Sequence, residues 1–358
     1  MKVLKFGGTS VGSAQRMKEV AKLITDGEQK IVVLSAMSGT TNTLVEISDY
    51  LYKKNPEGAN EIINRLEAKY KQHVNELYST DEYKQKTQEF IKAQFDYIRS
   101  YTKDIFTLFE EKVILAQGEL ISTNMVTNYL QEQGVNAILL PALEFMRTDK
   151  NSEPDPVYIK EKLAAQLEIH PDAEIYITQG FICRNAYGEI DNLQRGGSDY
   201  TASLIGAAVN ASEIQIWTDI DGMHDNDPRI VDKTSPVRHL HFEEAAELAY
   251  FGAKILHPTC VQPAKYANIP VRLLNTMEPT APGTLISNDT EKGKIKAVAA
   301  KDNITAIKIK SSRMLLAHGF LRKVFEIFES YQTSIDMICT SEVRSSREPG
   351  TNCGSGMR

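Results

Sequence analysis

The sequence is poor in cysteine and tryptophan, and it has no long hydrophobic run. Only four of its 358 residues are cysteines, Cys183, Cys260, Cys339 and Cys353, and their spacing matches neither a zinc site nor a disulfide framework. Three of them lie in apolar stretches and are interpreted as reduced core thiols. No apolar run is long enough to cross a membrane, and no signal-peptide pattern precedes the first expected strand. We therefore expect a cytoplasmic protein without a membrane partner.

The charge pattern excludes a further class of partner. Lysine and arginine number 41 against 47 aspartates and glutamates, a net charge of −6, and no basic stripe stands out. A protein that binds the nucleic-acid backbone needs such a stripe. The remaining composition, 42% hydrophobic and 25% charged, is typical of a globular protein. The length predicts about two domains.

Strand-like and helix-like segments alternate over most of the chain. Strands are expected at residues 3–6, 31–34, 137–140, 174–183 and 213–218, with a hairpin turn at 185–189. Helices are expected at 14–24, 43–109 with a break at 55–58, 114–133 and 198–210. This alternation predicts an α/β sandwich with a largely parallel sheet, over residues 1–292.

The pattern changes near the C-terminus. Lys292 to Ala299 is expected to be a linker, and residues 300–343 a second, smaller domain. Within it, two strands at 304–309 and 334–340 flank an amphipathic helix at 319–330. Such a β-α-β piece leaves open sheet edges and needs a partner or a continuation. Residues 344–358 have no periodic pattern, and we expect an irregular tail, truncated or altered at its end.

The most informative motif is Lys5-Phe6-Gly7-Gly8-Thr9-Ser10, which follows the first strand. Two glycines allow a tight turn and a close approach to a ligand. A helix N-terminus and a lysine beside them favour an anion such as a phosphate. The motif is neither a P-loop nor a dinucleotide fingerprint. By itself it is equally consistent with a plain tight turn.

A second charged glycine segment is Arg195-Gly196-Gly197-Ser198-Asp199, at the start of an expected helix. Arginine can hold a carboxylate or phosphate with two parallel hydrogen bonds. Asp199 by itself is explained as a charge at a helix N-terminus. Two such anion sites in one chain, each beside a cation, instead suit a reaction between two anionic substrates.

Two further segments complete the pattern. Thr218 and Asp219 follow a strand, at the edge where α/β sheets bind ligands. Their alternative interpretation is an ordinary turn at Asp221-Gly222. Gly252-Ala253-Lys254 with His257-Pro258 could equally be the end of a helix, and His257 is more simply a structural residue. No second ligand stands at zinc spacing from His224.

Taken together and in this order, these motifs and Gly118-Glu119 resemble those of aspartate kinases, members of the amino-acid kinase superfamily. The resemblance extends from residue 1 to about Val343. It implies a three-layer αβα kinase domain with a partial ferredoxin-like ACT regulatory region behind it. It also implies transfer of the ATP γ-phosphoryl group to the side-chain carboxylate of L-aspartate, giving 4-phospho-L-aspartate, the first step of lysine, threonine and methionine biosynthesis.

The resemblance also implies roles for individual residues. Lys5 would stabilise the transferring phosphoryl group, and Asp199 would orient the lysines. The aspartate pocket would comprise Thr41, Glu119, Phe181, Arg195, Gly196 and Ser198. The nucleotide, with Mg²⁺ bridging its phosphates, would be bound by Lys5, Gly7, Gly8, Ser10, Thr218, Asp219, His224, Arg229 and Lys254. His224 departs from the tyrosine found in some members. Because a carboxylate is already ionised at neutral pH, no general base is required.

The ACT-like region would bind lysine or threonine as an effector. The matching residues are Met314, Gly319, Phe320, Leu321, Asp336, Ser341 and Glu342, although Leu316 and Ala317 stand where some lysine-inhibited relatives have polar residues. A homodimer or higher homo-oligomer is implied. One alternative is another amino-acid kinase, acting on glutamate, N-acetylglutamate or a nucleoside monophosphate. The other is a non-catalytic amino-acid sensor that keeps the pocket but has lost turnover. The joint motifs favour aspartate, and the presence of Lys5 and Asp199 argues against the sensor.

Overall fold

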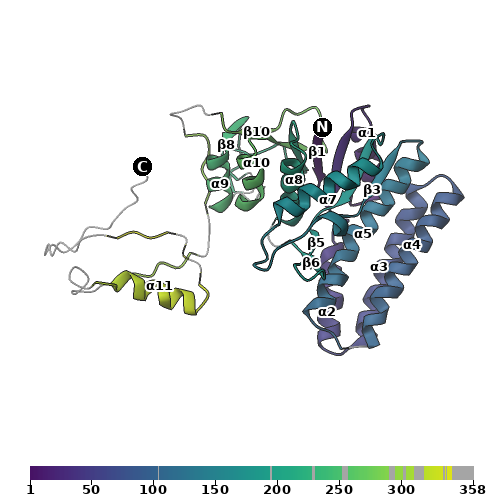
Figure 1. The fold of residues 1–358 in the computed structure, drawn as a ribbon, viewed down its shortest axis with the longest axis horizontal. Coiled ribbons are helices and arrows are strands. Elements are labelled where there is room, and N and C mark those ends of the chain that lie inside the picture. Colours follow the sequence, from purple (N-terminus) through teal and green to yellow (C-terminus); the bar gives the residue numbers. More distant parts are fainter. Residues whose placement is uncertain are drawn as a thin grey trace. The chain divides into compact units, whose positions relative to one another are not determined.

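The computed structural model divides the chain into two compact units, Met1–Lys301 and Asp302–Arg358. Figure 1 shows the fold. The structure describes residues 1–103, 105–193, 196–227, 230–251, 257–289, 295–300, 304–309, 318–333, 335 and 337–340. The first unit contains all the strands among these residues.

An eight-stranded sheet forms the centre of the first unit. Its order is β3-β4-β2-β1-β7-β9-β10-β8. The six strands from β3 to β9 run parallel, and β10 pairs antiparallel with β9. The bounds are β1 Lys2–Phe6, β2 Lys30–Leu34, β3 Ala137–Leu140, β4 Ile175–Gln179, β7 Ile214–Thr218, β8 His239–His241, β9 Val271–Asn275 and β10 Thr284–Ser287. A separate hairpin joins β5 (Ile182–Arg184) to β6 (Ile190–Asn192).

Helices cover both faces of the sheet, as the period of two along buried strands requires. Leu4 and Phe6 of β1 belong to one hydrophobic core, while Val3 belongs to the other. The first core is closed by α1 Ala14–Ile24, α2 Thr40–Tyr52, α3 Pro56–Leu77, α4 Asp81–Ser100 and α5 Leu108–Glu132. The second is closed by α6 Ala142–Phe145, α7 Pro156–Ile169, α8 Gly197–Ala208, α9 Phe242–Tyr250 and α10 Gln262–Tyr266. The predicted three-layer αβα sandwich is therefore confirmed.

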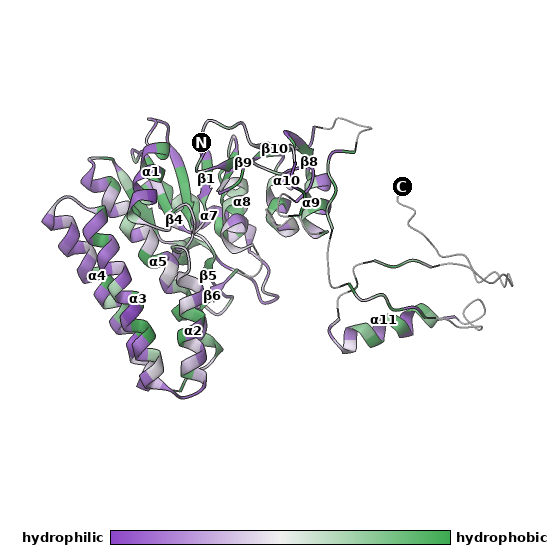
Figure 2. Cartoon of the chain, turned by 180° about the vertical axis from the view of Figure 1, so that it is seen from behind, coloured by the Kyte–Doolittle hydropathy of each residue, from purple (hydrophilic) through white to green (hydrophobic). Residues whose placement is uncertain are grey.

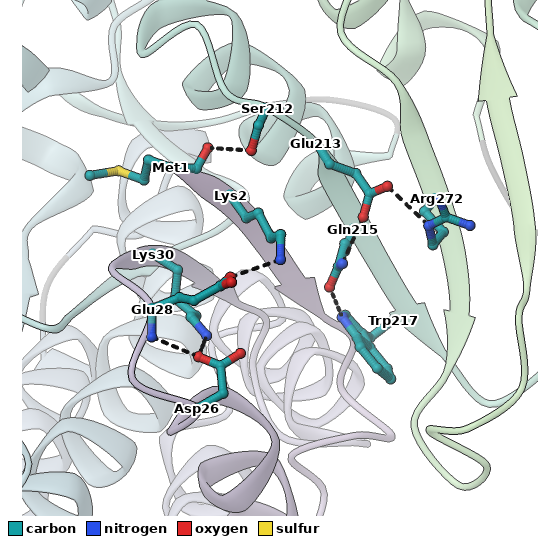
Figure 3. A network of polar contacts seen from close by, with 10 residues as sticks. All are labelled: Met1, Lys2, Asp26, Glu28, Lys30, Ser212, Glu213, Gln215, Trp217 and Arg272. Carbon is teal, nitrogen blue, oxygen red and sulfur yellow. Dashed lines mark hydrogen bonds and ion pairs between the residues drawn. The ribbon is translucent and has the colours of Figure 1, made fainter.

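Polar contacts fix the start of β1 against its neighbours (Figure 3). Lys2 Nζ lies 2.8 Å from Glu28 Oε2, and the carbonyl of Met1 accepts a hydrogen bond from Ser212. On the next strand, Glu213 Oε2 lies 3.0 Å from Arg272 Nε. These contacts set the register at the N-terminal ends of the central strands. They thereby also set the level at which β1 ends at its C-terminus.

Most expected elements form with small shifts, and three expectations are wrong in detail. The helical stretch expected from Thr43 breaks a second time, between α3 and α4. The strand expected over 174–183 is divided into β4 and β5, because the backbone turns at Gly180 and Phe181. The helix carrying Glu119 starts at Leu108 rather than Ile114, where Thr107 and Glu110 form a capping box. Short 3₁₀ turns, η1 Tyr101–Lys103 and η2 Pro258–Val261, complete the elements of this unit.

The second unit contains α11 (Phe320–Ser330), close to the helix expected there. The strands expected at 304–309 and 334–340 do not form in the described parts of those ranges. A strand requires a ladder of hydrogen bonds to a neighbour, and these residues have none that the structure describes. Met314, Asp336, Ser341, Glu342 and the expected tail lie outside the described residues.

Side-chain polarity follows the layers (Figure 2). The exposed face of α4 is mainly hydrophilic, while the strands behind α5 are hydrophobic. Among the described residues, no helix combines the length and the apolarity needed to cross a bilayer. Cys183 and Cys260 are buried as expected, whereas Cys339 is exposed, so its expected place in a core is wrong.

Candidate functional site

The candidate site lies where β1, β2 and β7 end. β1 pairs in parallel with both neighbours, so that Phe6 is level with Leu34 on one side and with Trp217 on the other. The chain moves from β1 toward β2 on one side and later reaches β7 on the other. Such a switch point, at the carboxyl ends of parallel strands, is where open α/β sheets bind ligands.

The glycine turn after β1 packs closely on the turn after β2. A Cβ on Gly8 would lie 2.8 Å from the carbonyl oxygen of Ala36, and the Ser38 N–H donates to the Gly8 carbonyl at 3.1 Å. Only glycine allows this approach. The Gly7 N–H donates to the Trp217 carbonyl at 3.4 Å, so the turn also contacts the end of β7.

Lys5 and Asp199 form a largely buried ion pair across this edge. Lys5 Nζ lies 2.7 Å from Asp199 Oδ1, and the two side chains are 11% and 15% exposed. Asp199 stands in the first turn of α8, which begins after Gly196 in a left-handed conformation (φ 76°). The contact is an ion pair, and Asp199 Oδ1 has no hydrogen-bond partner among the described residues. The pair therefore fixes a cation beside Gly7.

The start of α8 packs on the turn between β4 and β5. A Cβ on Gly180 would lie 2.4 Å from Ser198 Oγ, and a Cβ on Gly197 would lie 2.5 Å from Phe181 Cδ2. Phe181 itself has a left-handed backbone (φ 67°), which is uncommon for a bulky residue. Its N–H donates to Thr201 Oγ1 at 3.0 Å. Two glycines and one strained residue thus bring Phe181 and Ser198 together.

These turns and helix starts line an open cavity of about 340 Å³. It is lined by Gly8, Ser35, Ala36, Met37, Ser38, Gly39, Thr41, Asn42, Glu119, Phe181, Gly197 and Ser198. Five of these, Gly8, Thr41, Glu119, Phe181 and Ser198, were predicted as site residues from the sequence. Their spread over 190 positions of the chain shows that the fold assembles the cavity from distant segments.

Two helix N-termini open into the cavity. α2 begins after Gly39 (φ 80°) and α8 after Gly196 (φ 76°), and neither glycine supplies a side-chain cap. Thr41 and Asn42 of α2, and Gly197 and Ser198 of α8, line the cavity. The first N–H groups of a helix have no partner within it and attract anions. Both ends suit a carboxylate.

Glu119, in the middle of α5, supplies the carboxyl group of the cavity. Its side chain is 3% exposed, and Oε2 has no hydrogen-bond partner among the described residues. Burial raises the pKa of the Glu119 carboxyl to about 8, and the backbone of Ala36 offsets only part of this effect. The neighbouring Gly118 admits the helix, because a Cβ there would lie 2.7 Å from that of Ala36. An unpaired buried carboxyl group is costly, and it suits a cationic ligand group.

The residues predicted for the nucleotide are only partly assembled around this cavity. Thr218 and the exposed Asp219 lie at the end of β7, next to the glycine turn. Ser10 is buried and bonded to Thr276 Oγ1 at 2.8 Å, so its side chain does not face the cavity. His224 Nδ1 lies 2.8 Å from Thr234 Oγ1. Arg195, Arg229 and Lys254 lie outside the described residues.

The effector residues belong to the second unit. Gly319, Phe320 and Leu321 lie at the start of α11, where Gly319 is left-handed (φ 83°). The other four predicted effector residues lie outside the described part of the chain.

The sequence-based prediction missed Ser35 and its neighbours. Ser35 Oγ donates to Ser198 Oγ at 3.0 Å, and the Ser35 carbonyl accepts from Ser122 Oγ at 2.8 Å. It therefore links β2, α5 and α8. The available signal was a run of small residues, Ser35-Ala36-Met37-Ser38-Gly39, directly after a buried strand.

Comparison with known proteins agrees with this architecture. Residues 1–275 match the model of the amino acid kinase family. The chain belongs to the amino acid kinase family. Within it, the chain is 35% identical to the lysine-sensitive aspartokinase 3 of Escherichia coli, over 95% of this chain and 76% of that protein. It is 38% identical to the chloroplastic aspartokinase 1 of Arabidopsis thaliana, of which it spans 62%, just under two thirds. The resemblance to aspartokinases is thereby confirmed.

Solved structures support the same family placement. The E. coli aspartokinase III structure in complex with aspartate and ADP superposes with a TM-score of 0.81, at 32% identity, covering 96% of this chain and 77% of that one. The aspartate kinase of Clostridium acetobutylicum gives a TM-score of 0.76 at 26% identity, covering 95% and 76% of the two chains.

Proposed function

We propose that the chain is an aspartate kinase (EC 2.7.2.4), which transfers the γ-phosphoryl group of ATP to the side-chain carboxylate of L-aspartate. One observation carries the proposal. A buried Glu119 carboxyl, whose Oε2 has no partner among the described residues, and two helix N-termini share one cavity, and the Lys5–Asp199 pair stands beside it. A molecule with one ammonium and two carboxylates matches this set of groups, and aspartate is the smallest such amino acid with a side-chain carboxylate acceptor.

The binding step follows from charge. Glu119 pairs with the substrate ammonium and gives up its proton, because a nearby cation favours the ionised form. The N-terminus of α2, at Thr41, and that of α8, at Ser198, bind the two carboxylates. Arg195, with its fork of donors, holds one of them, and Gly196 lets the backbone approach. Phe181 closes the apolar side of the pocket and fixes the orientation of the acceptor.

The chemical step needs positioning and charge stabilisation more than proton transfer. The acceptor carboxylate is already a nucleophile at neutral pH. Lys5 aims its ammonium at the phosphoryl group as negative charge develops on it, and Asp199 positions that ammonium. The product is a mixed anhydride of aspartate and phosphate, with ADP as the leaving group.

The nucleotide is bound across the ends of β1 and β7, by Gly7, Gly8, Thr218 and Asp219, with Ser10, His224, Arg229 and Lys254 completing the set. Mg²⁺, bound with ATP, supplies neutralisation of the phosphate charge. The described residues contain no group of three or more acidic, histidine or cysteine side chains that could hold a metal. Mg²⁺ would be held mainly by the ATP phosphates and water, with Asp199 and Asp219 as the protein carboxylates at that edge.

The domain organisation, the effector and the assembly belong to the same proposal. Residues 1–292 form the catalytic domain and 300–343 a partial ACT regulatory domain, followed by an irregular tail at 344–358. The effector of the regulatory domain is lysine or threonine, and Gly319 to Leu321 belong to the effector site. The enzyme acts in the cytoplasm as a homodimer or larger homo-oligomer. Two E. coli aspartokinase III structures, one with aspartate and ADP and one with lysine and aspartate, support the substrate and effector classes by analogy.

A coupled ADP-release assay tests the function. The chain is supplied with MgATP and, in turn, L-aspartate, L-glutamate, N-acetyl-L-glutamate and uridine monophosphate. We expect turnover with aspartate alone. Turnover with another acceptor would assign a different specificity within the family. Binding of aspartate without turnover would identify a sensor.

A further inference from the structure

A second cavity, of about 290 Å³, shares Phe181 with the first. It is formed by the start of α5, the segment 148–152 and the end of β6. The residues that matter here are Lys112, Thr148, Asp191 and Asn192. None of them has a part in the proposed kinase reaction. The volume is near the lower end of small-ligand sites, which is about 300 Å³.

Two polar atoms in the wall of this cavity have no partner. Thr148 is 4% exposed, and its Oγ1 makes no hydrogen bond among the described residues. The same holds for Asn192 Nδ2. The backbone of each residue is held in place, because the Thr148 N–H donates to the Arg184 carbonyl at 2.9 Å and the Asn192 N–H to Asp191 Oδ1 at 2.7 Å. Buried polar atoms are nearly always satisfied, so these two indicate a missing partner.

An ion pair stands beside these atoms. Lys112 Nζ lies 2.7 Å from Asp191 Oδ1, with side chains 28% and 14% exposed. The pair is neutral as a whole, and the third charged residue of the lining, Glu111, accepts a hydrogen bond from the Tyr52 hydroxyl at 2.7 Å. A ligand with a net charge would compensate one member and leave the other unpaired, which is unfavourable in a partly buried site. A ligand with both charges can pair with both members at once.

We propose that the second cavity binds a small zwitterion of the α-amino-acid class. The ligand carboxylate accepts hydrogen bonds from Lys112 and from Asn192 Nδ2. The ligand ammonium lies against Asp191, and Thr148 Oγ1 accepts from it. A short side chain packs on Leu115 and Leu193, which also line the cavity.

Phe181 gives this site a connection to the first cavity. The residue lines both, and its backbone carbonyl accepts from the Leu193 N–H at 2.7 Å. A ligand that contacts the Phe181 ring in one cavity limits the positions that the ring can adopt in the other cavity. Occupation of the second cavity therefore changes the affinity of the first, and the effect is reciprocal.

The binding test uses calorimetric titration of the full chain with four probes. L-valine and L-threonine are the zwitterions. Isovalerate and isobutylamine are the two halves of valine, each with a single charge. We expect both zwitterions to bind and the half-ligands to bind at least about tenfold more weakly, because each loses one charged contact. Equal binding of a half-ligand, or no binding by any probe, would overturn the proposal.

Three variants locate the site. Lys112→Met should weaken L-valine at least about tenfold, whereas Lys160→Met, at an exposed lysine of α7, should not change it. Thr148→Val and Asn192→Leu should also weaken binding, while leaving the free energy of unfolding unchanged or higher, since they remove unpaired polar atoms. A purely structural role would lower it. Binding that survives all three substitutions would place the ligand elsewhere and refute the assignment.

The coupling is measured by titrating L-aspartate with and without saturating L-valine. A change in aspartate affinity of about threefold or more, absent in Lys112→Met, is expected, and unchanged affinity would contradict a link through Phe181. Because valine binding and unfolding need no turnover, their failure would leave the proposed kinase activity standing. Conversely, absence of turnover would not affect this site.

Discussion

The Lys5 ammonium lies 2.7 Å from the Asp199 carboxylate. This contact joins the C-terminal end of β1 to the first turn of α8. The strand sets the height of the lysine, and the left-handed Gly196 sets the start of the helix. Neither residue reaches its position through local sequence alone. The pair is therefore a property of the assembled sandwich, and it makes the cation available where the two substrates of the proposed reaction meet.

Lys5→Ala should lower kcat on the order of a hundredfold or more, with a smaller effect on KM for aspartate or MgATP. The reason is that a cation aimed at charge developing in the transition state acts there preferentially. Steady-state kinetics provide the measurement. Lys2→Ala is the matched control, since Lys2 lies at the opposite end of the same strand and pairs with Glu28. A near-normal kcat for Lys5→Ala would refute the assigned role.

Glu119 should make aspartate binding depend on pH. Its carboxyl is protonated in the free protein below its raised pKa of about 8, and it must ionise to pair with the substrate ammonium. Aspartate affinity should therefore rise as the pH increases from 6 to about 8, and each binding event should release a proton. Calorimetry in buffers of different ionisation enthalpy measures that proton. In Glu119→Gln both effects should vanish; a wild-type affinity that is flat over this range would contradict the role.

The same raised pKa has a consequence for stability. In the unfolded chain Glu119 ionises near its ordinary value, so stability falls as the pH rises from about 4.5 toward 8, and is constant above that. At pH 7 the cost is about 3 kcal/mol. Glu119→Gln should accordingly raise the free energy of unfolding at pH 7 while it weakens aspartate binding. Denaturant unfolding of both proteins is the measurement, and a destabilised variant would indicate a structural carboxylate instead.

Gly197→Ala should displace the Phe181 ring, because the new Cβ would lie 2.5 Å from Phe181 Cδ2. We expect KM for aspartate to rise by about tenfold or more, with a loss of stability of about 1–3 kcal/mol from the overpacking. Gly58→Ala is the matched control. There a Cβ would lie 2.6 Å from the ring of Tyr50, and neither Gly58 nor Tyr50 lines the cavity. An equal rise of KM in both variants would show that crowding acts through general stability.

The ionised Glu67 carboxylate should contribute to the free energy of unfolding at neutral pH. Burial acts to raise the pKa of its carboxyl, but hydrogen bonds from Lys71 and Arg99 outweigh this and lower it. A lowered pKa gives stability that is present above the unfolded value and lost as the pH falls through the folded value. Glu67→Gln should cost about 1–3 kcal/mol at pH 7 and reduce the steepness of acid unfolding. Glu46→Gln, at an exposed pair with Arg65, should do neither.

The sequence was sufficient for the elements whose pattern is local. The helix expected at 14–24 forms over those residues, since its apolar period is readable, and the structure adds a Ser13 cap at its start. The sequence was insufficient where contacts with residues distant in the chain determine the backbone conformation. The apolar run 174–183 gives no sign that Phe181 turns left-handed, because that conformation is imposed by Thr201 and by contact with Gly197. Ser35 was missed for the same reason: its partners Ser122 and Ser198 are far along the chain.

The central claim is that the acceptor of the phosphoryl group is the side-chain carboxylate of L-aspartate. The most direct test incubates the chain with MgATP and L-aspartate in the presence of hydroxylamine, which converts an acyl phosphate into a hydroxamate. We expect ADP and aspartate β-hydroxamate to form in equal amounts, and Lys5→Ala to suppress both. Formation of ADP without the hydroxamate, or of a hydroxamate from glutamate but none from aspartate, would contradict it.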